Sequence, residues 1–319
     1  MTATRVTDER GFRHEALLYA GIEQFIARTT PFIEGALEAD EPILVVVSRP
    51  KIELLRTAIG KDADRVQFRD MAEVGANPAR IIPAWHDFVE AHAKDGRRLR
   101  GIGEPIYPER TAPELIESQR HEALLNAAFD GGPDFWLLCP YNTQALNPTV
   151  VETAHLTHPV IADGHRTSAS DLYPGAAASV TPYDRQLPEP SALCATLVFD
   201  AERLAAVRRL VSREAANAGF VTRPIADLVL AVNEVATNSV QHGGGAGTLR
   251  IWGDGGVLVC EVRDRGHFED PLADRRRPAP GQNGGRGLWL ANQLCDLVQL
   301  RSFSSGTTVR LHMHRDRSR

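Results

Sequence analysis

The sequence predicts two domains of different fold class: an α/β domain with a mostly parallel sheet, then an α+β domain built as a two-layer sandwich. Its 319 residues exceed the roughly 100 to 200 that one core usually organises. The first half alternates short apolar runs with longer amphipathic ones. The last third instead places two helical patterns in succession, followed by pairs of strands joined by glycine-rich turns.

The alternation in the first half begins at about residue 43. The predicted strands are Ile43 to Val47, Val66 to Arg69, Leu99 to Gly103 and Phe135 to Cys139. The predicted helices between them are Lys51 to Ala58, Pro78 to His92 and Pro113 to Phe129. Strands that alternate with helices predict a parallel sheet covered by helices. Before this region we expect one further helix, which carries His14 and Tyr19.

Residues 161–193 are rich in Pro, Ser, Gly and Ala and contain few periodic apolar positions. This composition is typical of a linker. We therefore expect a first domain over residues 1–160, a linker over 161–193 and a second domain over 194–319.

The second domain is expected to begin with a strand, two helices and two strands. These are Ala195 to Phe199, Ala201 to Ala218, Pro224 to Gln241, Thr248 to Trp252 and Val257 to Arg263. A loop rich in glycine and proline then leads into a helix and two last strands, which are Gly287 to Cys295, Leu297 to Phe303 and Thr307 to Met313.

Composition excludes several classes of protein. The chain is 43% hydrophobic and 24% charged with a net charge of −5, which lacks the basic excess of a dedicated nucleic-acid binder, and no helix-turn-helix pattern stands out. No apolar run approaches the about 20 residues that cross a bilayer, and the polar start is unlike a signal peptide. We therefore expect a cytoplasmic protein that contacts neither nucleic acid nor membrane. The four separate cysteines predict reduced thiols.

Glu234 and Asn238 lie four residues apart on the second helix of the C-terminal domain. This spacing places the carboxylate and the amide on nearly the same side of the helix. An amide oxygen suits Mg²⁺, and a nearby carboxylate can accept a proton. Taken alone, the pair is also what a solvated helix surface carries.

Further motifs follow along the chain. Asp264 and Gly266 end a strongly apolar strand, where a carboxylate can accept a hydrogen bond from an adenine amino group and a glycine lets a flat ring approach. Gly285 and Gly287 lead into a helix, whose N-terminal N–H groups suit phosphate. Thr307 starts the last strand and offers a hydroxyl. The Walker-type phosphate loop motif is absent from the sequence.

In this order and within one compact domain, these motifs resemble the GHKL family with its Bergerat ATPase fold, and within it the anti-sigma-factor serine kinases. The resemblance implies that Asn238 coordinates Mg²⁺ and Glu234 acts as the catalytic base. It also implies that Asp264, Gly266, Gly285, Gly287 and Thr307 bind ATP. Residues 265–284 would form a lid. Three arginines of that segment, Arg275 to Arg277, read as a solvated run, with contact to phosphates or an acidic partner as the alternative.

Several stretches of the first half resemble the sensory domain named for methanogens, methylotrophs and the regulator DcmR. These include HEALLY from His14, PFIEGAL from Pro31, GEP from Gly103, LCPY from Leu138 and THP from Thr157. The resemblance implies a RecA-like or Rossmann-like fold that senses a small molecule. Candidate ligand-sensing residues are His14, Tyr19, Glu104, Cys139 and Tyr141, several of them at carboxyl ends of predicted strands. His155 and His158 lack a third grouped ligand, so we expect no metal there.

Together these observations predict a signalling regulator whose sensory domain controls a Mg-ATP-dependent serine/threonine kinase domain. The implied partners are a sigma factor, an anti-sigma antagonist of the STAS type, or both, and the resemblance also implies a homodimer. The alternative is a non-catalytic switch, in which ATP binding only shapes a surface for a partner.

Overall fold

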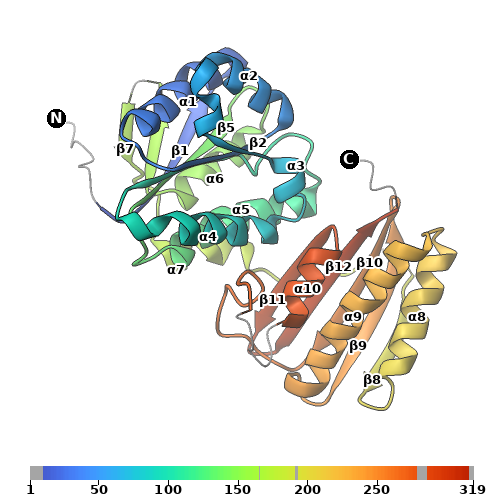
Figure 1. The fold of residues 1–319 in the computed structure, drawn as a ribbon. Helices are drawn as coiled ribbons and strands as arrows, with labels where there is room; N and C mark the ends of the chain where they lie inside the picture. The colour runs from blue at the N-terminus through green and yellow to red at the C-terminus, as the bar shows by residue number, and fades with distance from the viewer. Residues whose placement is uncertain (1–9, 165, 191–192, 279–285, 316–319) are drawn as a thin grey trace. The chain divides into compact units, whose positions relative to one another are not determined.

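The structure is a computed structural model of the chain. It describes residues 10–164, 166–190, 193–278 and 286–315. The chain divides into two compact units, Met1–Tyr183 and Asp184–Arg319, which are drawn from blue to green and from yellow to red in Figure 1. Each unit is described by itself.

Unit 1 is built on a seven-stranded sheet with the order β3-β2-β4-β5-β1-β6-β7. All neighbouring strands are parallel except β6 and β7, which pair antiparallel. The strands are β1 Phe12–Tyr19, β2 Ile43–Val47, β3 Gln67–Asp70, β4 Leu99–Gly103, β5 Phe135–Asn142, β6 Val160–Asp163 and β7 Arg166–Ala169. The predicted mostly parallel sheet is confirmed.

Helices cover both faces of this sheet (Figure 1). Helices α1 Gly21–Glu38 and α2 Arg49–Ile59 contact β2 on one face, where Phe25, Ile33 and Leu55 are fully buried. The opposite face carries α4 Ile81–His92, α5 Ala112–Ala128, α6 Pro148–Thr157 and the short α7 Ala176–Val180. The short helix α3 Met71–Val74 follows β3, and single 3-10 turns are η1 Gly60–Arg65, η2 Pro78–Arg80, η3 Ala93–Asp95 and η4 Thr181–Tyr183.

The first predicted helix is wrong. His14 and Tyr19 lie on β1, which pairs with β5 on one side and β6 on the other. The segment HEALLY consists mostly of good helix formers, but β1 is a central strand, and its residues from His14 to Tyr19 are buried. Packing on both faces of a parallel sheet overrides the local preference.

Much of the expected linker over residues 161–193 belongs to folded units. Residues 160–163 and 166–169 form β6 and β7, and α7 and η4 pack against α5. Tyr183, the last residue of unit 1, is buried. The small polar residues of this segment therefore form an edge strand and a short helix of unit 1.

Unit 2 is a two-layer sandwich (Figure 1). Its antiparallel sheet has the order β11-β12-β10-β9-β8, and three helices pack on one face. The strands are β8 Ala195–Asp200, β9 Ala246–Asp254, β10 Val257–Asp264, β11 Leu297–Phe303 and β12 Gly306–His314. The helices are α8 Leu204–Asn217, α9 Thr222–His242 and α10 Arg286–Leu294. Every element expected in this domain is present.

The two faces of the unit 2 sheet differ in chemistry. Alternate residues of β10, such as Leu258, Cys260 and Val262, enter the apolar core beneath the helices. On the other face Glu261 accepts hydrogen bonds from Arg250 and Arg310. The chain just after the unit boundary lies across this polar face, because the carbonyls of residues 185 and 188 accept bonds from Arg301 and Arg310, and Glu189 pairs with Arg250 and Arg263.

None of the helices in the described ranges combines the length and apolar character that crossing a bilayer requires.

Candidate functional site

Helix α9 carries Glu234 and Asn238 beside the start of α10. Both side chains are half-buried, and both lie against Gly287 in the first turn of α10. A Cβ at Gly287 would lie 2.9 Å from Asn238 Nδ2 and 3.4 Å from Glu234 Oε2. The absence of a side chain at position 287 therefore allows the N-terminus of α10 to approach the carboxylate and the amide closely.

Asp264 ends β10 directly across from α9. Its Oδ2 accepts a hydrogen bond of 2.6 Å from the Ser239 hydroxyl, and its Oδ1 accepts one of 2.8 Å from the backbone N–H of Gly266. Gly243, at the end of α9, packs so closely that a Cβ there would lie 2.4 Å from Asp264 Cγ. The carboxylate is thus held in one orientation from two sides.

Thr307 begins β12 next to this carboxylate. Its hydroxyl donates 2.8 Å to the carbonyl of Gly266 and lies 3.1 Å from Ser302 Oγ. Ser302 Oγ also accepts the backbone N–H of Phe268 at 2.7 Å. These bonds tie the loop after β10 to the β11–β12 hairpin.

One pocket gathers most of the residues that the sequence singled out. Asn238, Asp264, Gly266 and Thr307 line it, together with Val235, His242, Gly243, His267, Phe268, Leu288 and Val309. Glu234 and Gly287 stand beside Asn238. Gly285 lies outside the described residues. The arrangement places a carboxylate pair, an amide and a helix N-terminus around one apolar hollow.

The pocket is narrow in this conformation. Its free volume is about 40 Å³. Phe268, from the loop after β10, lines the pocket and packs on the core of the unit.

The arginines at positions 275–277 make contacts with the protein and do not form the solvated charged run that the sequence predicts. Arg275 is 0% exposed, Arg276 pairs with Asp270 at 2.9 Å, and the Arg277 guanidinium lies 5.6 Å from the ring centroid of Trp289. The backbone carbonyl of residue 274 also accepts a bond from Asn292 of α10. This part of the loop is therefore packed onto α10.

Sequence reasoning missed three residues of the site. Ser239 lies on α9, Gly243 follows the helix in a run of three glycines, and Ser302 lies in the hairpin before Thr307. The glycine run signals a close approach of chains, but nothing in the sequence links Ser239 or Ser302 to Asp264.

In unit 1, Tyr19 and Glu104 come together at the carboxyl ends of β1 and β4. Only Glu104 was expected at the end of a strand, because Tyr19 was expected on a helix. The Tyr19 hydroxyl donates to Glu104 at 2.6 Å, and Lys51 Nζ of α2 reaches both residues at 2.5 to 2.7 Å. Burial raises the pKa of Glu104, and Lys51 offsets this only in part. Lys51 was not predicted.

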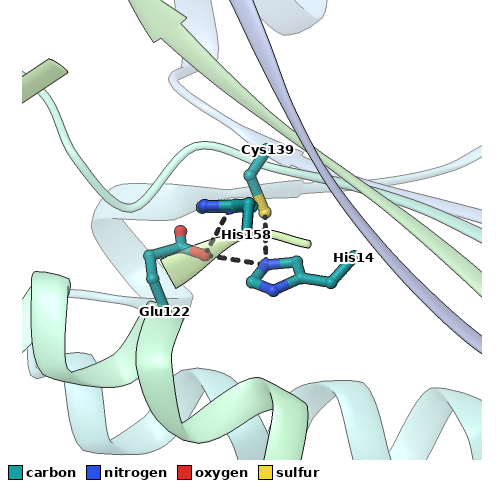
Figure 2. Close-up of side chains that lie close together, drawn as sticks. All are labelled: His14, Glu122, Cys139 and His158. Atoms are coloured by element: carbon teal, nitrogen blue, oxygen red, sulfur yellow. Dashed lines mark hydrogen bonds and ion pairs between the residues drawn. The ribbon is translucent and has the colours of Figure 1, made fainter. Parts of the chain in front are cut away.

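His14 and Cys139 belong to a second group, on the face of the sheet that α4 to α6 cover. They meet Glu122 of α5 and His158, which follows α6 (Figure 2). His14 Nε2 lies 3.0 Å from Glu122 Oε2 and 3.4 Å from Cys139 Sγ, and His158 Nε2 lies 3.3 Å from the same carboxylate oxygen. We call these four residues the His14 cluster. Tyr141 packs edge-on against His158, 5.5 Å between ring centroids.

Burial shifts the pKa of two groups in this cluster. It lowers the pKa of His14 to about 4, and His158 beside it adds to the shift. Burial also raises the pKa of the Cys139 thiol well above its usual range, with a further contribution from Glu122.

The five predicted ligand-sensing residues do not form one site. Tyr19 and Glu104 form one polar group, and His14 and Cys139 form another, with Tyr141 at its border.

Comparisons with known proteins agree with this division. Residues 13–159 match the family model described as MEDS, the methanogen/methylotroph, DcmR sensory domain. Residues 197–313 match the histidine kinase-like ATPase domain. A search of curated proteins finds no significant match.

Two solved structures resemble part of the chain. The RsbU and RsbW domains of Rv1364c from Mycobacterium tuberculosis align with 22% identity over 39% of this chain and 32% of that chain, with a TM-score of 0.30. The histidine kinase AdeS of Acinetobacter baumannii aligns with 14% identity over 39% of this chain and 70% of that one, with a TM-score of 0.24. The chain thus spans about a third of the mycobacterial structure. From the family matches, this chain carries a MEDS sensory domain at its N-terminus and a histidine kinase-like ATPase domain at its C-terminus.

Proposed function

We propose that unit 2 binds Mg-ATP and transfers its terminal phosphoryl group to a serine or threonine hydroxyl of a regulatory partner protein, under the control of unit 1. The observation that carries this proposal is the convergence of Glu234, Asn238 and Gly287 on one side of the pocket with Asp264 on the other. Phosphoryl transfer depends mainly on positioning and charge stabilisation, which such a small set can supply.

Each residue has a distinct proposed role. The Asp264 carboxylate, oriented by Ser239 and Gly266, accepts a hydrogen bond from the adenine amino group. The helix N-terminus at Gly287 faces the phosphates. Asn238 offers an amide oxygen for Mg²⁺, which would offset phosphate charge when bound. Gly285 and Thr307 complete the proposed nucleotide contacts.

Glu234 is the proposed catalytic base. As the acceptor hydroxyl attacks the terminal phosphorus, its proton passes to the Glu234 carboxylate, while the bond from phosphorus to the bridging oxygen of ADP breaks. The carboxylate lies one helical turn before Asn238, so the base and the metal-binding amide address the same end of the nucleotide.

The partner we propose is a sigma factor, an anti-sigma antagonist, or both, with the acceptor hydroxyl on the antagonist. This rests on the combined resemblance of the four motifs to anti-sigma-factor serine kinases. The ligand of unit 1 would act by favouring one functional state of the chain. A homodimer through unit 2 is part of the same proposal.

The decisive experiment incubates the full chain with labelled ATP and a candidate antagonist. We expect transfer with the native chain, loss of transfer with retained ATP binding in Glu234→Gln, and weakened Mg-ATP binding in Asn238→Ala. Asn233→Ala is the matched control, because Asn233 is on the same helix and contacts Arg208 at the surface. Undiminished transfer in both site variants would overturn the residue assignment. ATP binding with no transfer to any antagonist would favour the non-catalytic switch.

A further inference from the structure

We propose that the His14 cluster is a binding site for a divalent transition metal ion of the zinc class, enclosed within unit 1. This inference concerns His14, Glu122, Cys139 and His158 and is independent of the kinase activity proposed for unit 2. The sequence suggested no metal, because His155 and His158 had no third ligand nearby. The structure supplies the missing ligands from distant parts of the chain.

The four residues come from four different elements: β1, α5, β5 and the C-terminal end of α6. Each has an exposure of 0% or 1%, and their ligand atoms all lie within 4.8 Å of one another. Figure 2 shows the two imidazoles, the carboxylate and the thiol directed at a common point. An ion held there would link the centre of the sheet to the two helices that cover it.

The spacing of the ligand atoms fits tetrahedral coordination. Zinc bonds of about 2.0 to 2.3 Å to nitrogen, oxygen and sulfur place neighbouring ligand atoms roughly 3.3 to 3.6 Å apart. The contacts from Glu122 Oε2 to the two histidines are 3.0 and 3.3 Å, and that from Cys139 Sγ to His14 Nε2 is 3.4 Å. The remaining ligand atoms lie within 4.8 Å of one another, so side-chain shifts of up to about one ångström would complete tetrahedral spacing around an ion.

The hydrogen bonds of the other ring nitrogens prepare both histidines for metal binding. The Asn126 amide donates from Nδ2 to the Thr157 carbonyl at 2.8 Å, so its Oδ1 faces His14 Nδ1 at 3.1 Å and must accept. His158 Nδ1 lies 3.0 Å from the Ala154 carbonyl, which can only accept. Both Nδ1 atoms therefore carry a proton, and each neutral ring directs the lone pair of Nε2 at the cluster. This second layer is typical of histidines that bind metals.

The charges of the cluster also fit a divalent cation. Two neutral imidazoles, a carboxylate and a thiolate match two positive charges and provide the mixed nitrogen, oxygen and sulfur donors that zinc accepts. On binding, the Cys139 thiol releases its proton to solvent. In the described part of the chain, Glu122 Oε1 has no hydrogen-bond donor. A buried carboxylate that faces two nitrogen lone pairs is costly without a cation.

Asn126 gives the cluster a connection to the surface. It bonds His14 and also lines a groove of about 770 Å³ at the edge of unit 1 where Phe12 and Pro159 lie.

The first test uses the full chain, stripped with a chelator and then titrated with Co²⁺. We expect close to one ion bound per chain, tetrahedral visible bands, and a thiolate-to-cobalt charge-transfer band in the near ultraviolet. Cys139→Ser should remove the charge-transfer band, and His158→Gln should weaken Co²⁺ binding at least tenfold. Cys194→Ser is the matched control and should keep the spectrum. A charge-transfer band that persists in Cys139→Ser overturns the proposal.

Because ligand variants can fail to fold, the second test uses the native chain alone. X-ray absorption at the zinc edge should show one sulfur and three nitrogen or oxygen neighbours after the protein is loaded with Zn²⁺. The chelator should lower the melting temperature of unit 1, and Zn²⁺ should restore it. A folded chain that takes up no stoichiometric metal would instead show that a shared proton holds the carboxylate and imidazoles together, and would overturn the proposal.

Discussion

The Ser239 hydroxyl is one of two described donors that hold the Asp264 carboxylate. It is 0% exposed and donates to Asp264 over 2.6 Å. A carboxylate that loses such a donor both turns more freely and retains an unsatisfied oxygen near the core. The orientation of Asp264 therefore depends on a buried serine that no motif of the sequence links to it.

Ser239→Ala is expected to lower the unfolding free energy by about 1.5 to 3 kcal/mol and to weaken ATP binding about tenfold, or roughly 1.4 kcal/mol. Urea unfolding and calorimetric titration would measure the two effects. Thr237→Val is the matched control on α9, because the Thr237 hydroxyl bonds only its own helix, at the Asn233 carbonyl. Unchanged affinity in Ser239→Ala would contradict the orienting role.

At the scale of the secondary-structure element, the close approach of the start of α10 to α9 depends on the absence of a side chain at Gly287. A Cβ there would meet the far end of the Asn238 side chain at 2.9 Å. Such an end can swing aside at small cost, so the fold should survive while the amide leaves its position. Gly287→Ala is thus expected to separate stability from function.

We expect Gly287→Ala to change the melting temperature little but to weaken Mg-ATP binding at least tenfold, because Asn238 is displaced. Gly253→Ala in β9 is the matched control, since a Cβ there meets nothing within 4 Å. Thermal unfolding would measure the melting temperature of each variant, and nucleotide titration at fixed Mg²⁺ would measure its affinity for Mg-ATP. If Gly287→Ala bound Mg-ATP with the affinity of the native chain, Mg-ATP binding would not depend on the present position of the Asn238 amide.

Strand β10 has an ionic centre on its outer face. Burial acts to raise the pKa of Glu261, but hydrogen bonds from Arg250 and Arg310 outweigh it, so the pKa lies below its usual range. The folded state therefore gains stability from the ionised carboxylate above the unfolded pKa of about 4.3. That gain disappears as the pH falls through the still lower pKa of the folded state.

Glu261→Gln should destabilise unit 2 at pH 7 by about 3 kcal/mol, because the buried Arg310 guanidinium loses its counter-ion. The difference from the native chain should shrink as the pH falls below about 4.3. Hydrogen exchange of the β10 amides between pH 3.5 and 7 would measure this difference in stability. Glu214→Gln, which affects a surface pair with Arg213, is the control and should change stability by less than about 1 kcal/mol.

Sequence reasoning succeeded where a feature lies within one contiguous stretch. The helices and strands of unit 2 were visible as local patterns, and so was the pair of Glu234 and Asn238 on one helix. Prediction from the sequence failed where contacts between distant parts of the chain determine the structure. The local sequence of β1 favours a helix, and only its pairing with β5 and β6 makes it a strand. The four residues of the His14 cluster are separated by up to 144 residues, the difference between positions 14 and 158. No spacing rule connects such positions.

At the scale of the whole molecule, unit 1 ends at Tyr183 and unit 2 begins at Asp184. Tyr183 is buried in unit 1, where η4 packs against α5, and α5 also carries Glu122. The carbonyl of residue 185 accepts a bond from Arg301 of unit 2. We therefore expect a change in the His14 cluster to reach unit 2 along this stretch of chain.

An insertion of Gly-Ser-Gly-Ser after Asp184 is expected to leave both domains folded and ATP affinity unchanged, but to abolish any effect of Zn²⁺ on that affinity. Added flexible residues absorb the motion that a short connection transmits. The same insertion in the exposed β9–β10 turn at Gly255 is the control and should preserve the Zn²⁺ effect. Nucleotide titration with and without Zn²⁺ would measure it, and an equal Zn²⁺ response in both variants would contradict the path through Asp184.

Glu189 pairs with both Arg250 and Arg263 on the outer face of the unit 2 sheet. The segment that follows Asp184 is therefore attached to that face by a charged side chain as well as by its backbone carbonyls.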